Sequence, residues 1–314
     1  MEIDSAGLRT LAAVVAAGTF DAAAHELHLT PSAVSQRIKA LETAVGRVVL
    51  QRGKPARPTA DGEVLLRLAK QWDWLHAEAT SALTGGVTAG ESDTDWVEPI
   101  HMPIAANADS LTIWLMPAIV AMSRSHNVVI EVMRGDETRT ADFLRSGSVL
   151  GAVTSDPTRI RGCTAVPLGA MRYLPVATPE FAARWFPSLG ASDARSPSPA
   201  ELSRAPMVSF DRSDAIQRTL IEDMVGRTAS PPTSYIPSST QYHLAVEAGI
   251  GWGAVPAMQA SQALDAGRVV RLSDQHRDVE LYWQHWRLHS PLLETFTALV
   301  RYTAAEVLLS SSIG

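Results

Sequence analysis

The side chains best suited to chemistry in the early part of the chain are polar and basic, and they lie between residues 30 and 58. This segment holds six Lys and Arg side chains against one acid, Glu42. Gln36 can read a base edge through paired hydrogen bonds, whereas small hydroxyls and cations can reach phosphates. The segment therefore predicts contacts to DNA. The candidate contact residues are Pro31, Ser32, Ser35, Gln36, Arg37, Lys39, Arg52 and Lys54.

A second set of polar residues follows apolar runs in the remainder of the chain, which is acidic and brings the whole sequence to a net charge of −6. Apolar runs such as 100–106 and 128–133 alternate with amphipathic stretches, a pattern typical of α/β units with a largely parallel sheet. Ligands of such sheets lie outside the carboxyl ends of the strands. The candidate ligand contacts at these ends are Asn107, Asp109, Ser110, Leu111, Ser155, Asp156, Asp211, Ser238 and Ser239.

These residues suggest a ligand with charges of both signs. Free amides at a helix start attract anions, so we expect amides near Ser110, with the serine hydroxyls at 238–239, to hold a carboxylate. Asp109, Asp156 or Asp211 would then meet amino groups. Taken singly, each Ser or Asp is more often a helix cap than a ligand contact. The hypothesis rests on their combination at one edge of the sheet.

Three helices and a bent loop are expected to position the DNA contacts. Thr19 can cap the second helix, and Thr30 can cap a third that starts at Pro31, where the missing N–H costs nothing. The basic run at 51–58 is bent by glycine and proline, which is typical of a wing. Together these features predict a winged helix-turn-helix. Periodicity alone also allows a solvated helix face in some other small bundle.

A longer helix is expected from Thr59 onward, with Thr59 or Asp61 as its cap. Its apolar residues recur at alternating spacings of three and four, the seam of a two-helix coiled coil, and this predicts a partner chain. The alternative is that the helix packs only on its own domain. The candidate dimerisation residues are Leu65, Leu68, Trp72, Leu75 and Ala79.

Several positions in the N-terminal segment resemble the LysR-type transcriptional regulators. The matching positions are 23–24, Leu27, 30–42, Gly46, Leu50, Arg52 and 59–62. The resemblance implies that Ser32, Ser35 and Gln36 contact DNA and that Arg52 lies in the wing. Pro58 departs from the family pattern just before the threonine, which leaves the exit path of the wing open.

Three later segments, 107–118, 169–177 and 281–283, resemble the LysG/ArgP branch of that family. This resemblance implies two α/β subdomains like those of periplasmic binding proteins, with a basic amino acid, lysine or arginine, bound between them. It also implies control of amino-acid export or metabolism genes, binding to double-stranded DNA, and a homodimer or homotetramer. RNA polymerase stays open as a further partner. No cofactor is expected besides the small-molecule effector.

The expected organisation is an N-terminal domain, a linker helix, a hinge and an effector-binding domain. Glycine-rich polar composition indicates the hinge. The strand around 281–286 is expected to return to the first subdomain, which makes that subdomain discontinuous. The ranges are 1–58 for the winged helix-turn-helix, 59–84 for the linker and dimerisation helix, 85–98 for the hinge, and 99–314 for the effector-binding domain, with subdomain I at 99–163 plus 270–314 and subdomain II at 164–269.

Two other classes of protein compete with a regulator. An enzyme fused to a DNA-binding module is disfavoured because no Gly-x-Ser-x-Gly elbow, phosphate-binding loop or His-Glu-x-x-His pair occurs, so no catalytic or metal-binding residue is assigned. A transport-type binding protein is disfavoured because the start of the chain lacks a signal peptide, and we expect a cytoplasmic protein. The lone Cys163 is expected to be a core residue. A LysR-type regulator with a different effector remains the main alternative.

Overall fold

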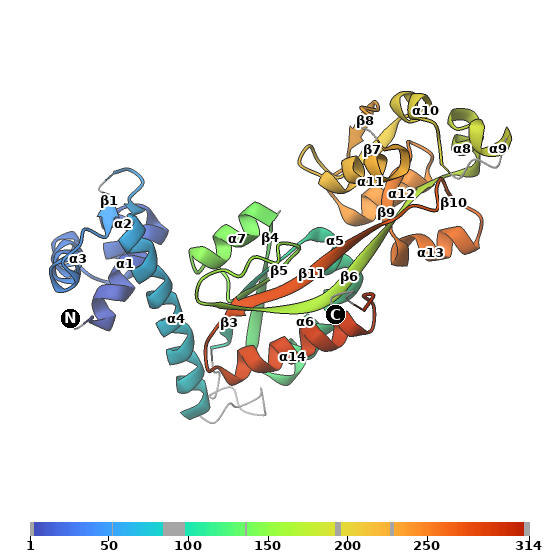
Figure 1. The fold of residues 1–314 in the computed structure, drawn as a ribbon. Helices are drawn as coiled ribbons and strands as arrows, with labels where there is room; N and C mark the ends of the chain where they lie inside the picture. The colour runs from blue at the N-terminus through green and yellow to red at the C-terminus, as the bar shows by residue number, and fades with distance from the viewer. Residues whose placement is uncertain are drawn as a thin grey trace.

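The computed structural model describes residues 3–51, 53–83, 98–135, 137–191, 196–226 and 229–310. Its N-terminal part is a bundle of three helices with a two-stranded wing (Figure 1). The elements are α1 (Ser5–Ala17), α2 (Phe20–Glu26), α3 (Pro31–Val45), β1 (Leu50–Gln51) and β2 (Arg57–Pro58). The predicted winged helix-turn-helix is therefore present. Within the described ranges, none of the helices has the length and hydropathy that crossing a lipid bilayer would need.

Local capping explains where these helices begin and end. The Thr19 hydroxyl accepts the amide of Ala22, and the Thr30 hydroxyl accepts the amide of Ala33, so α2 and α3 begin as predicted. Gly18 ends α1 in the left-handed region, with φ of 72°. Two of the helices thus begin at caps that can be read directly from the sequence.

A single long helix, α4 (Ala60–Leu83), follows the wing. The Thr59 hydroxyl caps it by accepting the Gly62 amide at 3.0 Å and itself donates to the carbonyl of Val48. A side chain at Gly62 would collide with the carbonyl of Val49, so α4 can lie this close to the wing only because residue 62 has no Cβ. Residues 85–97 of the predicted hinge, which was placed at 85–98, lie outside the described residues.

The rest of the described chain forms two α/β subdomains that share one sheet of seven strands. In subdomain I, β3 (Ile100–Ala106) pairs in parallel with β4 (Val128–Arg134) and β5 (Gly151–Thr154). The helical segments of this subdomain are α5 (Ala108–Ser110), the π-helical turn η1 (Leu111–Leu115), α6 (Met116–Ser125), α7 (Glu137–Arg145) and α14 (Pro291–Ala305). The predicted architecture of two α/β subdomains is present.

Two long strands, β6 (Cys163–Ala177) and β11 (Arg277–Trp286), run side by side from one subdomain into the other (Figure 1). They pair antiparallel, and β11 also pairs antiparallel with β5. The prediction of a largely parallel sheet was therefore wrong for this part. Because the chain enters subdomain II along β6 and returns along β11, these neighbours must run in opposite directions.

Subdomain II is built around the far end of β6, to which β9 (Gly253–Pro256) and β10 (Val270–Arg271) pair antiparallel. A separate parallel pair lies beside it. Its remaining elements are α8 (Pro179–Trp185), α9 (Ser188–Ala191), α10 (Pro199–Arg204), β7 (Met207–Ser209), α11 (Ala215–Val225), β8 (Thr233–Tyr235), α12 (Ser239–Glu247) and α13 (Ala257–Asp265).

Buried aromatic side chains dominate the core of subdomain I. Trp283 and Trp286 of β11 pack in one cluster with Trp114 of η1 and Phe296 of α14, and all four are almost fully buried. Burial of side chains this large contributes much of the stability of a domain. Cys163, at the start of β6, is buried in the same cluster, in agreement with a core role.

Candidate DNA interface and ligand cleft

The outer face of α3 carries most of the side chains predicted to contact DNA. Ser32, Gln36 and Arg37 are exposed. The opposite stripe, Val34 and Ile38, is buried against the rest of the bundle. Pro31 and Lys39 are exposed as well, whereas Ser35 is half-buried. A helix held by its apolar face and open on its polar face has the shape required to enter a major groove.

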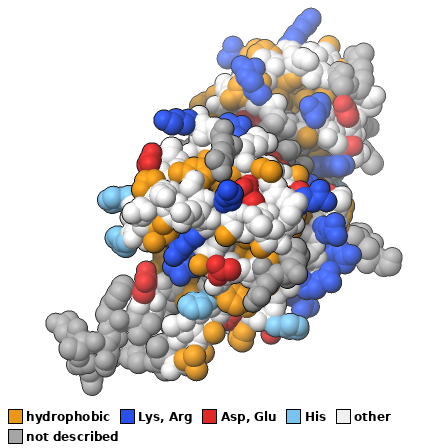
Figure 2. Space-filling model, turned by 90° about the vertical axis from the view of Figure 1, so that its left-hand side faces the viewer, with side chains coloured by type: hydrophobic (Ala, Val, Ile, Leu, Met, Phe, Trp, Pro, Cys, Tyr) orange, Lys and Arg blue, Asp and Glu red, His pale blue; other side chains and the backbone are white. Residues whose placement is uncertain are grey.

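The wing is held next to the helices by backbone hydrogen bonds. Gln51 of β1 pairs with Arg57 of β2, and the amide of Ala56 donates to the carbonyl of Gly18 at 2.7 Å. Lys54, at the tip, is exposed. Arg52 lies outside the described residues. Figure 2 views the molecule from the end that carries this domain and shows several Lys and Arg side chains at its surface.

A cleft of about 740 Å³ lies between the two subdomains. Four of the nine predicted ligand residues line it: Asn107, Asp109, Ser155 and Asp211. They come from the carboxyl ends of β3, β5 and β7, as the argument from strand ends required. The other five predicted ligand residues are absent from the described lining: Ser110, Leu111, Asp156, Ser238 and Ser239. Of these, Ser110 is fully buried.

Asp109 is a half-buried carboxyl group in the lining of the cleft. It accepts a hydrogen bond from the Tyr173 hydroxyl at 2.7 Å and a second from the Ser239 side chain. Burial raises the pKa of Asp109, while these two hydrogen bonds oppose the rise and the nearby charge of Asp214 adds to it. Asp109 therefore joins subdomain I to α12 of subdomain II and places a carboxyl group in the lining of the cleft.

The helix start that follows β3 does not offer the free amide at Ser110 that the sequence suggested. The amide of Ser110 donates to Asn107 Oδ1 at 2.7 Å, so Asn107 caps its own helix and occupies the predicted anion site. Ser239, at the start of α12, already bonds Asp109. The expected free amide at Ser110 is therefore taken, because a short polar side chain next to the helix start satisfies it locally. At α12, the capping residue Ser238 makes no side-chain hydrogen bond to the helix amides.

The two remaining predicted aspartates play local roles. The Asp156 side chain accepts the amide of Thr158 at 2.8 Å in an exposed turn, which places it outside the cleft lining. This hydrogen bond also lowers the pKa of Asp156. Asp211 does line the cleft, but its Oδ1 accepts both the amide and the hydroxyl of Ser213.

Sequence reasoning missed several groups that line the cleft. Asp214 caps α11 by accepting the amide of Ile216 at 2.9 Å. Arg134, the last residue of β4, donates to the carbonyl of Pro237 at 3.2 Å. A search of strand ends carried one residue beyond position 133 would have found Arg134. Also in the lining are Tyr173, Gln217, Tyr242, Arg277, Asp278 and Glu280.

The predicted seam on α4 divides into two parts. Leu68, Trp72 and Leu75 are exposed by 38%, 49% and 36%, and Ala79 is exposed too, so this stripe is open to a partner chain. Leu65, by contrast, is buried in the core of the N-terminal domain. The alternative that the helix packs on its own domain therefore holds for Leu65, because this N-terminal part of α4 packs against α1.

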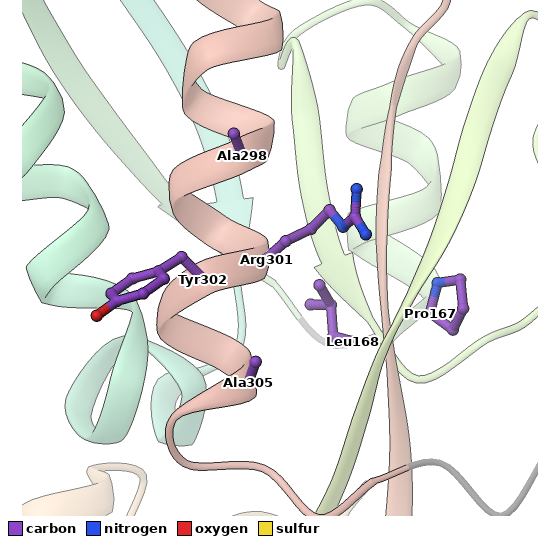
Figure 3. Close-up of a pocket in the computed structure, with 6 residues that line it drawn as sticks. All are labelled: Pro167, Leu168, Ala298, Arg301, Tyr302 and Ala305. Atoms are coloured by element: carbon purple, nitrogen blue, oxygen red, sulfur yellow. The ribbon is translucent and has the colours of Figure 1, made fainter.

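A separate, smaller hollow of about 400 Å³ lies between β6 and α14. Figure 3 shows Arg301 extending from α14 across it, while Tyr302 points the other way. Pro167 and Leu168 form the opposite wall. None of the predicted site residues lines this hollow, so it carries no part of the ligand hypothesis.

Comparisons with known proteins agree with this architecture. A family model described as "Bacterial regulatory helix-turn-helix protein, lysR family" matches residues 6–63, and a "LysR substrate binding domain" model matches residues 103–305. The chain belongs to the LysR family. Among its relatives, the "Lysine export transcriptional regulatory protein LysG" of Corynebacterium efficiens is 40% identical over 294 residues, which are 93% of this chain and 95% of the relative.

Two solved structures resemble this LysR-family chain along nearly its whole length. ArgP from Mycobacterium tuberculosis has a TM-score of 0.87 and 38% identity, with 99% of this chain and 100% of the other covered. Full-length LysG from Corynebacterium glutamicum with bound effector Arg has a TM-score of 0.82 and 34% identity, with coverages of 98% and 100%. The arrangement of both subdomains thus recurs in proteins of this family.

Proposed function

We propose that this chain is a sequence-specific DNA-binding transcription regulator that responds to lysine or arginine bound in the cleft between its subdomains. The observation that carries the proposal is the charge of the cleft. Its described lining holds five carboxyl groups, Asp109 among them, against two guanidinium groups. Such a cavity attracts a small cation. The Arg bound to the similar LysG structure supports the same effector class.

The regulator would act as a homodimer in the cytoplasm. The exposed stripe of Leu68, Trp72 and Leu75 would pair two α4 helices and set the spacing of two recognition helices on double-stranded DNA. The name of the Corynebacterium efficiens relative supports target genes in amino-acid export. The second candidate is a regulator with a different small molecule as effector. The two Arg side chains in the cleft lining would favour an acidic molecule.

Isothermal titration calorimetry tests the effector class directly. We expect L-lysine or L-arginine to bind the full-length protein and L-leucine to bind at least tenfold more weakly, because leucine lacks the side-chain cation. A gel shift on the upstream region of the gene, with and without the amino acid, tests the link to DNA. Equal binding of leucine and the basic amino acids would reject the proposed effector class.

A further inference from the structure

We infer that Arg134 is the residue that binds the α-carboxylate of the effector and thereby selects a free amino acid over a diamine. The inference rests on the proposed function, because it assumes that the cleft takes a basic amino acid. It assigns the anionic end of the ligand, whereas the acid-rich lining accounts only for the cationic end.

The backbone amides at the cleft are poor candidates for this role. Asn107 Oδ1 takes the amide of Ser110, and Asp214 takes the amides of Phe210 and Ile216. At α12, the Ser239 side chain bonds the Asp109 carboxyl group and also accepts from the Gln259 amide nitrogen at 3.0 Å. A negative group already lies at each of the starts of α11 and α12, so a second carboxylate there would be repelled.

A side-chain cation is the remaining way to hold a carboxylate, and the described lining offers two, Arg134 and Arg277. Arg277 Nη1 lies 3.8 Å from the Asp223 carboxylate, which partly neutralises its charge. The described contacts of Arg134 are different. Its guanidinium donates to the Pro237 carbonyl at 3.2 Å and lies 6.0 Å from the centre of the Phe210 ring. Neither contact supplies a negative charge, and a guanidinium can use its other N–H groups on a carboxylate.

The position of Arg134 also suits a ligand with two ends. Arg134 extends from β4 of subdomain I and contacts Pro237 and Phe210 of subdomain II, so it spans the cleft. Asp109 enters the same cavity from the start of α5. An amino acid whose carboxylate pairs with Arg134 can direct its cationic side chain toward Asp109 and Asp214. Its decarboxylated diamine would keep the second contact and lose the first.

Calorimetry with two ligand pairs tests this assignment: L-lysine against cadaverine, and L-arginine against agmatine. In the wild-type protein each amino acid should bind at least tenfold more tightly than its decarboxylated partner. Arg134→Gln should weaken amino-acid binding by about tenfold to a hundredfold and leave diamine binding unchanged, because a hydrogen bond between charged groups has that value. Arg134→Lys keeps the positive charge but not the two parallel N–H donors of the guanidinium. Its affinity for the amino acids should therefore lie between those of the wild type and Arg134→Gln.

Arg268→Gln is the matched control. It removes a guanidinium outside the cleft lining that pairs with Glu247, so it should keep the wild-type preference for amino acids. Because Arg134 is exposed, we expect Arg134→Gln to fold, which an unchanged melting temperature and unchanged DNA binding would establish.

The results separate this inference from the proposed function. If the wild-type protein binds basic amino acids but Arg134→Gln still prefers them over diamines, Arg134 does not hold the carboxylate. If Arg277→Gln abolishes the preference for amino acids over their decarboxylated partners and Arg134→Gln does not, Arg277 holds the carboxylate instead. If the wild-type protein binds neither basic amino acid, the proposed function fails and the inference fails with it.

Discussion

The indole N–H of Trp74 on α4 donates to the hydroxyl of Ser290, 3.0 Å away and 216 residues later in the chain. Ser290 is the cap of α14, and its hydroxyl also accepts the amide of Leu293. One turn further along α4, Glu78 accepts the amide of Leu292 at 2.8 Å. The linker helix therefore completes the start of a helix in subdomain I. Through these contacts the DNA-binding domain is fixed to the domain that holds the cleft.

Replacing Trp74 should destabilise the whole protein. Trp74→Ala leaves a large cavity in the core of subdomain I and should lower the free energy of unfolding by about 3–5 kcal/mol. Trp74→Phe keeps most of the packing and should cost about 1 kcal/mol through the lost hydrogen bond. Denaturant unfolding measures both. Tyr302→Ala, at a site that is 66% exposed, is the control and should stay within about 0.5 kcal/mol of wild type.

Gln36 and Lys54 should affect DNA binding in different ways. Gln36→Ala should weaken binding to the specific site by about 1–3 kcal/mol and relax the preference at one base pair. Lys54→Ala should weaken binding to all sequences alike and reduce the slope of log K against log salt by about 1. Fluorescence anisotropy with specific and scrambled duplexes at several salt concentrations measures both. Equal weakening on both duplexes by Gln36→Ala would show that Gln36 contacts only the backbone.

A charge in the exposed stripe of α4 should separate the protomers. Trp72→Glu places two carboxylates opposite each other across the seam, and we expect sedimentation velocity to show monomers at concentrations where the wild type is a dimer. Met258→Glu, at an apolar residue of α13 that is 55% exposed, controls for the added charge and should leave the assembly unchanged. If Trp72→Glu still forms dimers, the dimer interface does not lie at this stripe of α4.

Asp109 should make stability depend on pH. Its pKa is raised above the ordinary value of 3.8 by burial, so the folded chain holds this proton more tightly than the unfolded chain. Its stabilising contribution is then complete below pH 3.8 and is lost as the pH rises through the folded pKa. Asp109→Asn has no carboxyl group to ionise, so its stability relative to wild type should increase as the pH rises through the folded pKa of Asp109. Urea unfolding at a series of pH values measures this difference. A constant difference between the two proteins contradicts the raised pKa.

The same group should make effector binding depend on pH in the opposite direction. A cationic ligand needs the ionised carboxylate, so its affinity should fall as the pH is lowered toward the raised pKa of Asp109. In Asp109→Asn the affinity should be lower at neutral pH and nearly independent of pH. Calorimetry in buffers of different ionisation enthalpy would also detect the proton released on binding by the wild type.

Features set by neighbouring residues could be predicted from the sequence. Thr30 and Pro31 fix the start of α3 through contacts made within four residues, and Thr59 does the same for α4. Asn107 was correctly placed at the end of a strand, but its side chain was not recognised as the group that takes the amide of Ser110. Capping competes with ligand binding for the same amides, and composition alone does not say which of the two wins.

Features that depend on distant segments could not be predicted. The burial of Leu65 depends on α1, and the antiparallel pairing of β6 with β11 depends on a return path of 99 residues between Ala177 and Arg277. Arg134 gains its place through Pro237, 103 residues away. Hydrophobic spacing describes one element at a time and contains no information about which elements meet.

The return of the chain along β11 has a consequence for synthesis of the protein on the ribosome. Until residues 277–286 have emerged, β5 and β6 lack the strand that lies between them, and two sheet edges stay open. The last described contact is later still, where Leu309 pairs with Ala170 of β6. The DNA-binding domain can fold early, whereas the effector-binding domain can close only after residues 277–286 have been synthesised, and in that interval its exposed strands need protection from aggregation.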